Sequence, residues 1–287
     1  MVRECRPSVP TLLGQKAESP TSYAPEVLTP IPRQHPEVER EDALTRAVGY
    51  DAWHAWEASC LTNGGLPVVT MLKVVYSSDS PYLVESKSFK LYLHSLNSTR
   101  FGSTPAEARS ELAQLVAQDL SSVLQTKVRC YPHVALGGQF DFEGFEILEE
   151  GLNGLDLNQQ ESYLLPPVGE PREVRVCTHL LRSNCPVTGQ PDWGNLYVQA
   201  LVDGSINPAQ LLRMVVGMRD ERMFHEQACE QIYGQLWGGL HPARLLVACL
   251  YTRRGGIDIC PVRASDAGYL PRFLGQPEVL TRPSWRQ

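Results

Sequence analysis

The sequence predicts an α+β fold built from two similar units, each an antiparallel sheet with helices packed on one face. The order strand, helix, helix, strand occurs twice along the 287 residues, which is typical of a duplicated structural unit. A stretch rich in glycine and proline, at 151–172, separates the two occurrences. The share of apolar residues, 43%, is that of an ordinary globular protein and agrees with this prediction.

The first unit is expected to begin near residues 53–60. Residues 66–76 alternate between apolar and polar side chains, which indicates a strand, and 127–133 return as a second strand. Between these strands we expect two helices, over 89–96 and over 106–124, where leucine and valine recur at helical spacing. A further strand should precede the set.

The second unit repeats this order. Residues 195–202 alternate as a strand, 210–218 indicate a short helix, 224–236 a longer helix, and 244–251 a returning strand. Here too a strand is expected before the set.

These patterns divide the chain into four segments. Residues 1–45, rich in proline, serine, threonine and charge, predict a poorly ordered arm. The first unit covers 46–150, a linker covers 151–172, and the second unit covers 173–287.

Charge and hydropathy exclude several classes of protein. The formal net charge of −6 disfavours direct binding of nucleic acid. The apolar runs 211–218 and 245–251 are far shorter than the roughly 20 residues that cross a bilayer. The first 20 residues lack the apolar core of a secretory signal. We therefore expect a cytoplasmic protein without a membrane partner.

The eight cysteines are spread thinly and form no Cys-x-x-Cys pair, which indicates reduced thiols, most of them buried. Cys185 differs, because it lies in a segment of turn-forming residues, 184–194, with Asp192 seven residues further on. A loop favours an accessible thiol, and an acid beside it could move protons around a covalent intermediate. The alternative is a plain turn in which the aspartate accepts hydrogen bonds from backbone amides.

A second candidate is the pair His225 and Glu226, at the start of the long helix of the second unit. A carboxylate there could accept two hydrogen bonds from the N–H and NH₂ edge of a guanine-like ring. The histidine could contact the ligand or orient the acid. A surface pair, or a polar pair satisfied in the core, remains the alternative.

The segment 84–92 places charged and hydroxyl side chains at the mouth of an apolar helix. Ser86 and Ser88 could simply cap that helix. Alternatively, the helix N-terminus, Lys87 and the serines could hold a phosphate. The turn at 252–256 carries Arg253 and Arg254 before two glycines and could add a basic contact, or could be an exposed hairpin.

A metal site and a Rossmann-type dinucleotide site are both disfavoured. Cys177, His179 and Cys185 cluster in sequence, but their spacing fits no common zinc pattern. No Gly-x-Gly-x-x-Gly follows a strand, so a nicotinamide cofactor would have to bind without that fingerprint.

The motifs at 85–92, 183–194, 224–226 and 251–256 together resemble the two-module branch of the NADPH-dependent 7-cyano-7-deazaguanine reductases, the nitrile reductases of queuosine biosynthesis. The resemblance extends from about residue 50 to about residue 270. It implies two tandem tunnelling-fold modules with a ligand site at their interface. The first module shows no cysteine–aspartate pair, which implies one active site per chain, built from both halves.

The resemblance also implies a reaction, the four-electron reduction of a nitrile to an aminomethyl group. Cys185 would add to the nitrile carbon to form a thioimide, and Asp192 would supply the proton to nitrogen. Two hydrides from two molecules of NADPH would complete the reduction. By the same resemblance the substrate-binding residues are Glu85, Ser86, Lys87, His225 and Glu226. The expected NADPH contacts are Lys87, Ser88, Arg254 and Gly255, with Arg253 a weaker candidate.

Two other functions remain open at this point. One is a pterin or purine cyclohydrolase or synthase of the same fold, which would need a metal or another acid–base set. The other is a purine-binding protein without catalysis. The expected partners are a small deazapurine and further copies of the chain, as a homodimer or a higher homo-oligomer.

Overall fold

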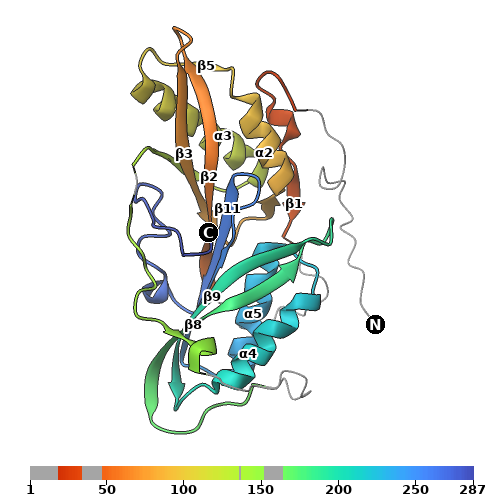
Figure 1. Ribbon diagram of the computed structural model, residues 1–287, viewed down its shortest axis with the longest axis vertical. Helices are drawn as coiled ribbons and strands as arrows, with labels where there is room; N and C mark the ends of the chain where they lie inside the picture. The colour runs from red at the N-terminus through yellow and green to blue at the C-terminus, as the bar shows by residue number, and fades with distance from the viewer. Residues whose placement is uncertain (1–18, 34–46, 136, 152–163) are drawn as a thin grey trace.

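The structure, a computed structural model, describes residues 19–33, 47–135, 137–151 and 164–287 (Figure 1). It confirms the α+β class, with a nine-stranded, mostly antiparallel sheet and helices on one of its faces. The first half contains η1 (Pro25–Val27), β1 (Pro30–Pro32), β2 (Val48–Thr62), β3 (Pro67–Ser77), β4 (Tyr82–Val84), α2 (Ser86–Ser95), β5 (Arg100–Phe101), α3 (Pro105–Leu124), β6 (Arg129–His133), β7 (Glu146–Ile147) and η2 (Leu148–Gly151).

The second half repeats the order of two strands, helices and a returning strand. It contains β8 (Pro171–Asn184), β9 (Pro191–Asp203), α4 (Pro208–Gly217), η3 (Met218–Asp220), α5 (His225–Leu240), β10 (Arg244–Tyr251), β11 (Ile257–Ala264) and η4 (Ala267–Tyr269). Most of the elements predicted from periodicity are confirmed within a few residues, and β2 and β8 are the two strands expected before each set. The last predicted strand, 244–251, has the bounds of β10.

One continuous sheet joins the two halves, in the strand order β6-β3-β2-β11-β10-β9-β8-β7, and the ninth strand, β5, pairs in parallel with the end of β2. The joint is the antiparallel pairing of β11 with β2, in which Ile257 lies opposite Ala55 and Ala264 lies opposite Val48. Every residue of β11 is buried, on both faces of the sheet. The sequence pattern missed β11 because a strand buried on both faces shows no alternation of apolar and polar residues.

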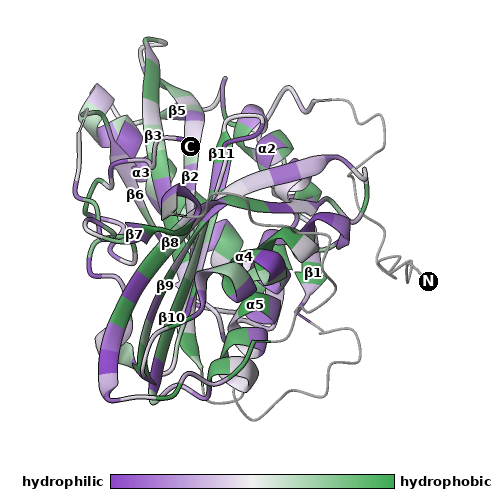
Figure 2. Ribbon diagram, turned by 60° about the horizontal axis from the view of Figure 1, so that its bottom comes forward, coloured by the Kyte–Doolittle hydropathy of each residue, from purple (hydrophilic) through white to green (hydrophobic). Residues whose placement is uncertain are grey.

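Apolar residues of the two halves pack in separate clusters on the helix face of the sheet. The first half packs α2 and α3 on β2 and β3, whereas the second packs α4 on β8, and α5 on β10 and β11 (Figure 2). Helix α3 shows why the segment is helical. Thr104 and Glu107 form a reciprocal capping box, and Leu112, Val116 and Leu120 line one fully buried side.

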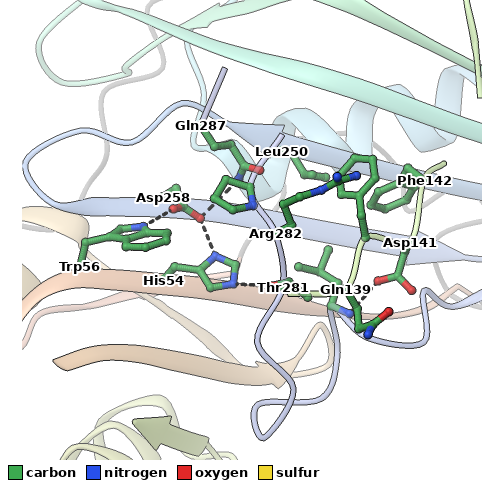
Figure 3. Close-up of a pocket in the computed structure, with 13 residues that line it drawn as sticks. His54, Trp56, Gln139, Asp141, Phe142, Leu250, Asp258, Thr281, Arg282 and Gln287 are labelled. Atoms are coloured by element: carbon green, nitrogen blue, oxygen red, sulfur yellow. Dashed lines mark hydrogen bonds and ion pairs between the residues drawn. The ribbon is translucent and has the colours of Figure 1, made fainter. Parts of the chain in front are cut away.

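The opposite face of the sheet is covered by residues 139–147 and by the C-terminal segment (Figure 3). His54 Nδ1 lies 2.6 Å from Asp258 Oδ1, and the indole N–H of Trp56 donates to the other oxygen of Asp258 at 2.6 Å. Thr281 lies 3.0 Å from the second ring nitrogen of His54, and the Gln287 amide donates to Asp258. These contacts attach the C-terminal segment to β2 and β11.

Residues 19–33 are folded onto the first half, in contrast with the poorly ordered arm expected over 1–45. Ala24, Leu28 and Ile31 are buried, and β1 pairs with β4. The apolar residues of this segment are too few for a periodic pattern, yet Leu28 packs into the hydrophobic core of the first half. The remaining residues of the expected arm, and most of the expected linker, lie outside the described residues.

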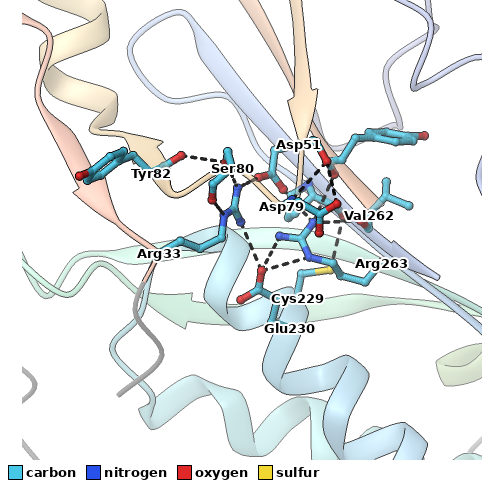
Figure 4. A network of polar contacts seen from close by, with 12 residues as sticks. Arg33, Asp51, Asp79, Ser80, Tyr82, Cys229, Glu230, Val262 and Arg263 are labelled. Atoms are coloured by element: carbon cyan, nitrogen blue, oxygen red, sulfur yellow. Dashed lines mark hydrogen bonds and ion pairs between the residues drawn. The ribbon is translucent and has the colours of Figure 1, made fainter. Parts of the chain in front are cut away.

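A buried network of four charged side chains crosses the joint between the halves (Figure 4). Asp51 on β2 accepts from Arg33 at 2.5 Å and from Arg263 on β11 at 2.9 Å. Glu230 on α5 accepts from the same two arginines, at 3.3 Å and 2.7 Å. Burial raises the pKa of Asp51, but the charges of Arg263 and Arg33 outweigh it, and the net pKa lies below its usual value.

Replacement of Asp51 by asparagine should destabilise the protein by about 3–5 kcal/mol, because two buried guanidinium groups lose a shared carboxylate. The measurement is the free energy of unfolding in urea. Glu173→Gln serves as the control, since it removes an ion pair with Arg175 that is largely exposed, worth about 0–1 kcal/mol. Equal effects of the two substitutions would contradict the prediction.

Candidate active site

A pocket of about 210 Å³ opens on the helix side of the joint between the halves. Ile31, Leu83 and Val84 from the first half line one side of it. The hairpin between β8 and β9, the start of α5 and the turn between β10 and β11 line the rest. A pocket at this joint therefore brings together side chains from both halves of the chain, as the resemblance implied.

Cys185 lies on the turn that joins β8 to β9 and contributes to the pocket wall. Its backbone N–H donates to the carbonyl of Gln190 at 2.8 Å, and its own carbonyl accepts from the N–H of Gly189 at 3.0 Å. Gly189 has φ +66°, a left-handed conformation that glycine adopts without strain. The turn therefore holds the thiol in a defined position, and only 7% of the residue is exposed.

Asp192, at the start of β9, lines the same pocket, so the hairpin brings the predicted cysteine–aspartate pair together. One carboxylate oxygen accepts from Arg254, and the other lies 3.4 Å from Nε2 of His225. Burial raises the pKa of Asp192, but the hydrogen bonds and charges of His225 and Arg254 outweigh it. The net pKa lies below its usual value, so this side chain is a carboxylate at neutral pH.

His225 is the first residue of α5, and its ring stacks on Tyr251 with a centroid separation of 3.9 Å. The stacking fixes the plane of the imidazole. Nε2 then faces Asp192, and the ring edge faces the pocket. The acid that His225 contacts is thus Asp192 of the hairpin, whereas the sequence analysis had considered the ligand or Glu226.

Glu226 is buried, with 3% of the residue exposed, and its Oε1 atom has no hydrogen-bond partner among the described residues. Burial, together with the nearby charge of Asp51 and against a smaller lowering by His225, raises the pKa of Glu226 to about 7. A buried carboxylate oxygen without a partner is costly unless a ligand donates to it. The Oε1 atom of Glu226 is therefore free to accept a hydrogen bond from a ligand.

Residues 85–88 divide between the pocket and the helix. Glu85 caps α2, because its two carboxylate oxygens accept from the backbone N–H groups of Lys87 and Ser88, each at 2.7 Å. Burial raises the pKa of Glu85, and these two hydrogen bonds lower it only in part. Ser86 lines the pocket, whereas Glu85 and Lys87 are not among its lining residues.

Ser88 corrects an expectation. The structure buries it completely, and its hydroxyl donates to the carbonyl of Glu85 at 2.7 Å and accepts from the backbone N–H of Thr29 at 3.0 Å. A hydroxyl occupied in this way supports the helix and the N-terminal segment and does not face a cofactor.

Lys90 is a pocket residue that the sequence analysis missed. Burial lowers the pKa of Lys90, and the charge of Arg254 lowers it further, which shows that the two cations are close. Lys90 follows Lys87 by three residues and therefore lies on the same side of α2. That spacing within the helix was the available signal.

The turn between β10 and β11 separates its two arginines. Arg254 and Gly255 line the pocket, and a Cβ atom at Gly255 would lie 3.2 Å from the side chain of Lys90. Arg253 points elsewhere, with its guanidinium 4.2 Å from the centroid of the Trp56 ring. The pocket therefore carries two basic groups, Lys90 and Arg254, beside a glycine that leaves the backbone open.

The residues weighed for a zinc site are dispersed. The Cys177 thiol donates to a carbonyl on the far face of the sheet, and His179 Nδ1 lies 2.8 Å from the Asn195 side chain. Within the described ranges, His54, Asp258 and Cys260 do bring ligand-type atoms together, on the face opposite the pocket. Their polar atoms already hydrogen-bond one another and the C-terminal segment.

The pocket thus combines a thiol, a carboxylate beside it, a second carboxylate with a free oxygen, and two cations. This set of groups is typical of an enzyme that binds a small heterocycle and forms a covalent bond to it through cysteine.

Comparison with known proteins also indicates an enzyme. A family model described as "Nitrile reductase, 7-cyano-7-deazaguanine-reductase N-term" matches residues 19–131, and one described as "QueF-like protein" matches 191–268. The NADPH-dependent 7-cyano-7-deazaguanine reductase of Acinetobacter baylyi is 37% identical over 91% of this chain and 95% of its own length. The Stenotrophomonas maltophilia reductase of the same name is 40% identical over 88% of this chain and 92% of its own length.

The chain belongs to this family of NADPH-dependent 7-cyano-7-deazaguanine reductases. A crystal structure titled as the apo form of an archaeosine synthase QueF-Like protein aligns with a TM-score of 0.30 and 14% identity, covering 34% of this chain and 96% of that one. Among the described residues, no helix is long and apolar enough to cross a membrane.

The raised pKa of Glu226 predicts a cost in stability. Between the unfolded value of 4.5 and the folded value of about 7, the folded protein binds a proton that the unfolded chain releases. Stability therefore falls as the pH rises through this range, and the penalty is fully present above pH 7. Glu226→Gln should raise the melting temperature at pH 8 by at least a few °C and should have little effect near pH 4.5.

The control for this experiment is Glu221→Gln, an exposed glutamate shortly before α5. It should leave the pH dependence of the melting temperature unchanged. A pH-independent effect of Glu226→Gln would show that the burial of its charge is not the cause.

Proposed function

We propose that this chain reduces the nitrile of 7-cyano-7-deazaguanine to 7-aminomethyl-7-deazaguanine with NADPH, through a thioimide on Cys185, in queuosine biosynthesis. The observation that carries the proposal is the common pocket of Cys185, Asp192 and the unpartnered carboxylate of Glu226. Family membership supplies the class of reaction, an NADPH-dependent reduction.

The first step is the addition of the Cys185 thiol across the C≡N bond. The sulfur bonds to carbon, one π bond of the nitrile breaks, and nitrogen gains one proton, so that no electrons are exchanged. Because its pKa is low, Asp192 is ionised before the substrate binds and can accept the thiol proton. It then passes that proton to nitrogen, while His225 and Arg254 hold the carboxylate in place.

Two molecules of NADPH, bound in turn, would supply one hydride each, the first to the thioimide carbon and the second to the imine that remains when the C–S bond breaks and Cys185 regains its proton. One proton would be taken up with each hydride. The residues fit such a cofactor, because Lys90 and Arg254 gather positive charge at the pocket and Gly255 leaves room beside Lys90. Lys87, on the same side of α2, would extend this charge. Asp192 and the released Cys185 thiol remain the proton carriers of the second reduction.

Recognition of the heterocycle is assigned to Glu226 with Ser86 and His225. The free oxygen of Glu226 would accept from the N–H and NH₂ edge of the deazaguanine, and the ionised form of the acid is needed for this. Because the pKa of Glu226 is about 7 without ligand, binding should tighten as the pH rises through 7 and should release a proton. Glu85 would then contribute indirectly, by capping helix α2, whose first residue, Ser86, lines the pocket.

The two halves, 46–150 and 173–287 joined by 151–172, would be tandem tunnelling-fold modules. A deazapurine is the expected ligand, without direct binding of nucleic acid, and the chain would assemble as a homodimer or a higher homo-oligomer. The described cysteines are all free thiols, which agrees with action in the reducing cytoplasm.

Incubation with 7-cyano-7-deazaguanine alone should give a covalent adduct of one substrate per chain. Cys185→Ala should abolish it, and Cys177→Ala, a buried cysteine on the far face, should retain it. Intact-protein mass spectrometry measures the adduct. An intact protein that binds the nitrile but forms no adduct would overturn the thioimide mechanism.

Asp192→Asn should lower turnover by roughly 10²–10⁴-fold, because the amide cannot carry the proton to nitrogen. Binding of the deazaguanine, measured by calorimetry, should persist. NADPH oxidation near the wild-type rate would show that another group protonates the nitrogen.

A further inference from the structure

A second basic site lies outside the pocket, on the hairpin that carries Cys185 and Asp192. The pocket, with about 210 Å³, is smaller than the roughly 300–1,000 Å³ of sites that enclose one drug-sized ligand. A deazaguanine and a whole dinucleotide cannot both lie inside it. If the proposed function holds, most of the cofactor, including its adenosine half, must therefore extend over the neighbouring surface.

Trp193 offers a stacking surface there. It follows Asp192 on β9, and 38% of it is exposed. Three guanidinium groups surround its indole ring. The carbon of the Arg182 guanidinium lies 5.5 Å from the ring centroid, that of Arg219 5.9 Å and that of Arg286 5.4 Å. Arg182 comes from β8, Arg219 from η3 and Arg286 from the C-terminal segment, so three distant segments converge on one ring.

None of these three arginines forms an ion pair with a carboxylate in the part of the chain that the structure describes. Their hydrogen-bond acceptors are uncharged. Arg182 donates to the side chain of Asn184 at 3.1 Å, and Arg286 donates to the carbonyl of His179. The Nε atoms of Arg182 and Arg219 are buried without a partner. Three like charges gathered without a counter-ion favour the binding of an anion.

The same contacts tie this site to the catalytic hairpin. The Asn184 side chain donates to the carbonyl of Arg219 at 2.6 Å, and Asn184 directly precedes Cys185. The backbone N–H of Thr252 donates to the carbonyl of Trp193 at 2.7 Å, at the start of the turn that carries Arg254. Asp192 and Trp193 are neighbours on β9, so their side chains point to opposite faces of the sheet. A cofactor that reaches both the pocket and the Trp193 surface therefore has to pass around the end of the hairpin, between Asn184 and Pro191.

We propose that Trp193 with Arg182, Arg219 and Arg286 binds the adenosine 2′-phosphate end of NADPH and thereby selects NADPH over NADH. The phosphate monoester carries nearly two negative charges at neutral pH, and guanidinium groups bind it in a forked geometry. Adenine has a π face that stacks on an indole ring or on a guanidinium plane. This inference rests on the proposed function for the identity of the ligand.

Direct binding tests the site without turnover. Adenosine 2′,5′-bisphosphate should bind the wild-type protein more tightly than adenosine 5′-monophosphate does, as measured by calorimetry. Arg219→Gln and Arg286→Gln should each weaken the bisphosphate by roughly tenfold or more and leave the monophosphate nearly unchanged. Arg172→Gln is the control, because Arg172 lies on the same strand β8, is exposed and donates to Ser205.

Equal binding of the two nucleotides by the wild-type protein would overturn the proposal, and so would equal effects of Arg219→Gln and Arg172→Gln. The kinetic counterpart is the ratio of kcat/KM for NADPH to that for NADH, which should fall roughly tenfold in Arg219→Gln through KM. Loss of the Cys185 adduct would refute the proposed function, whereas an unchanged ratio with a normal adduct would refute this site alone.

Discussion

The antiparallel pairing of β2 with β11 is the contact on which the rest of the structure depends. It joins two sets of strands and helices into one sheet, and the pocket opens where the joint meets the helix side. The network of Arg33, Asp51, Glu230 and Arg263 crosses the same joint below the pocket, fully buried. A slip at this joint would separate the wall formed by α2 from the hairpin that carries Cys185.

The pocket holds two carboxylates whose surroundings push their pKa values in opposite directions. Asp192 lies beside Arg254 and His225, and their charges outweigh its burial. Glu226 is buried with the negative charge of Asp51 nearby, and burial dominates. Asp192 is thus ionised at neutral pH and can accept a proton, whereas Glu226 is only partly ionised there, because its pKa is about 7. Two carboxyl groups in one pocket can therefore have different ionisation states, because one lies beside positive charges and the other is buried.

The motif at residues 85–88 did not by itself determine which of its side chains face the pocket. Their spacing correctly indicated a helix start with charged and hydroxyl groups, but two readings, cap and ligand contact, stayed open. The structure assigns Glu85 and Ser88 to the cap and leaves Ser86 in the pocket. Side chains within the first helical turn point in different directions, and only the packing of α2 on the N-terminal segment decides which of them face a ligand.

Local periodicity determined most helices and strands of the two repeated sets, because one buried face imposes a repeat of 3.6 or of 2 residues. The motifs around Cys185, Glu226 and Arg254 likewise sufficed to name the family, and the residues of these motifs meet in one pocket, although Lys90 was missed. Tertiary structure alone decided the place of β11, the folding of residues 19–33 onto the sheet and the gathering of three arginines around Trp193. These features depend on contacts between residues tens to hundreds of positions apart, and such contacts leave no local pattern in the sequence.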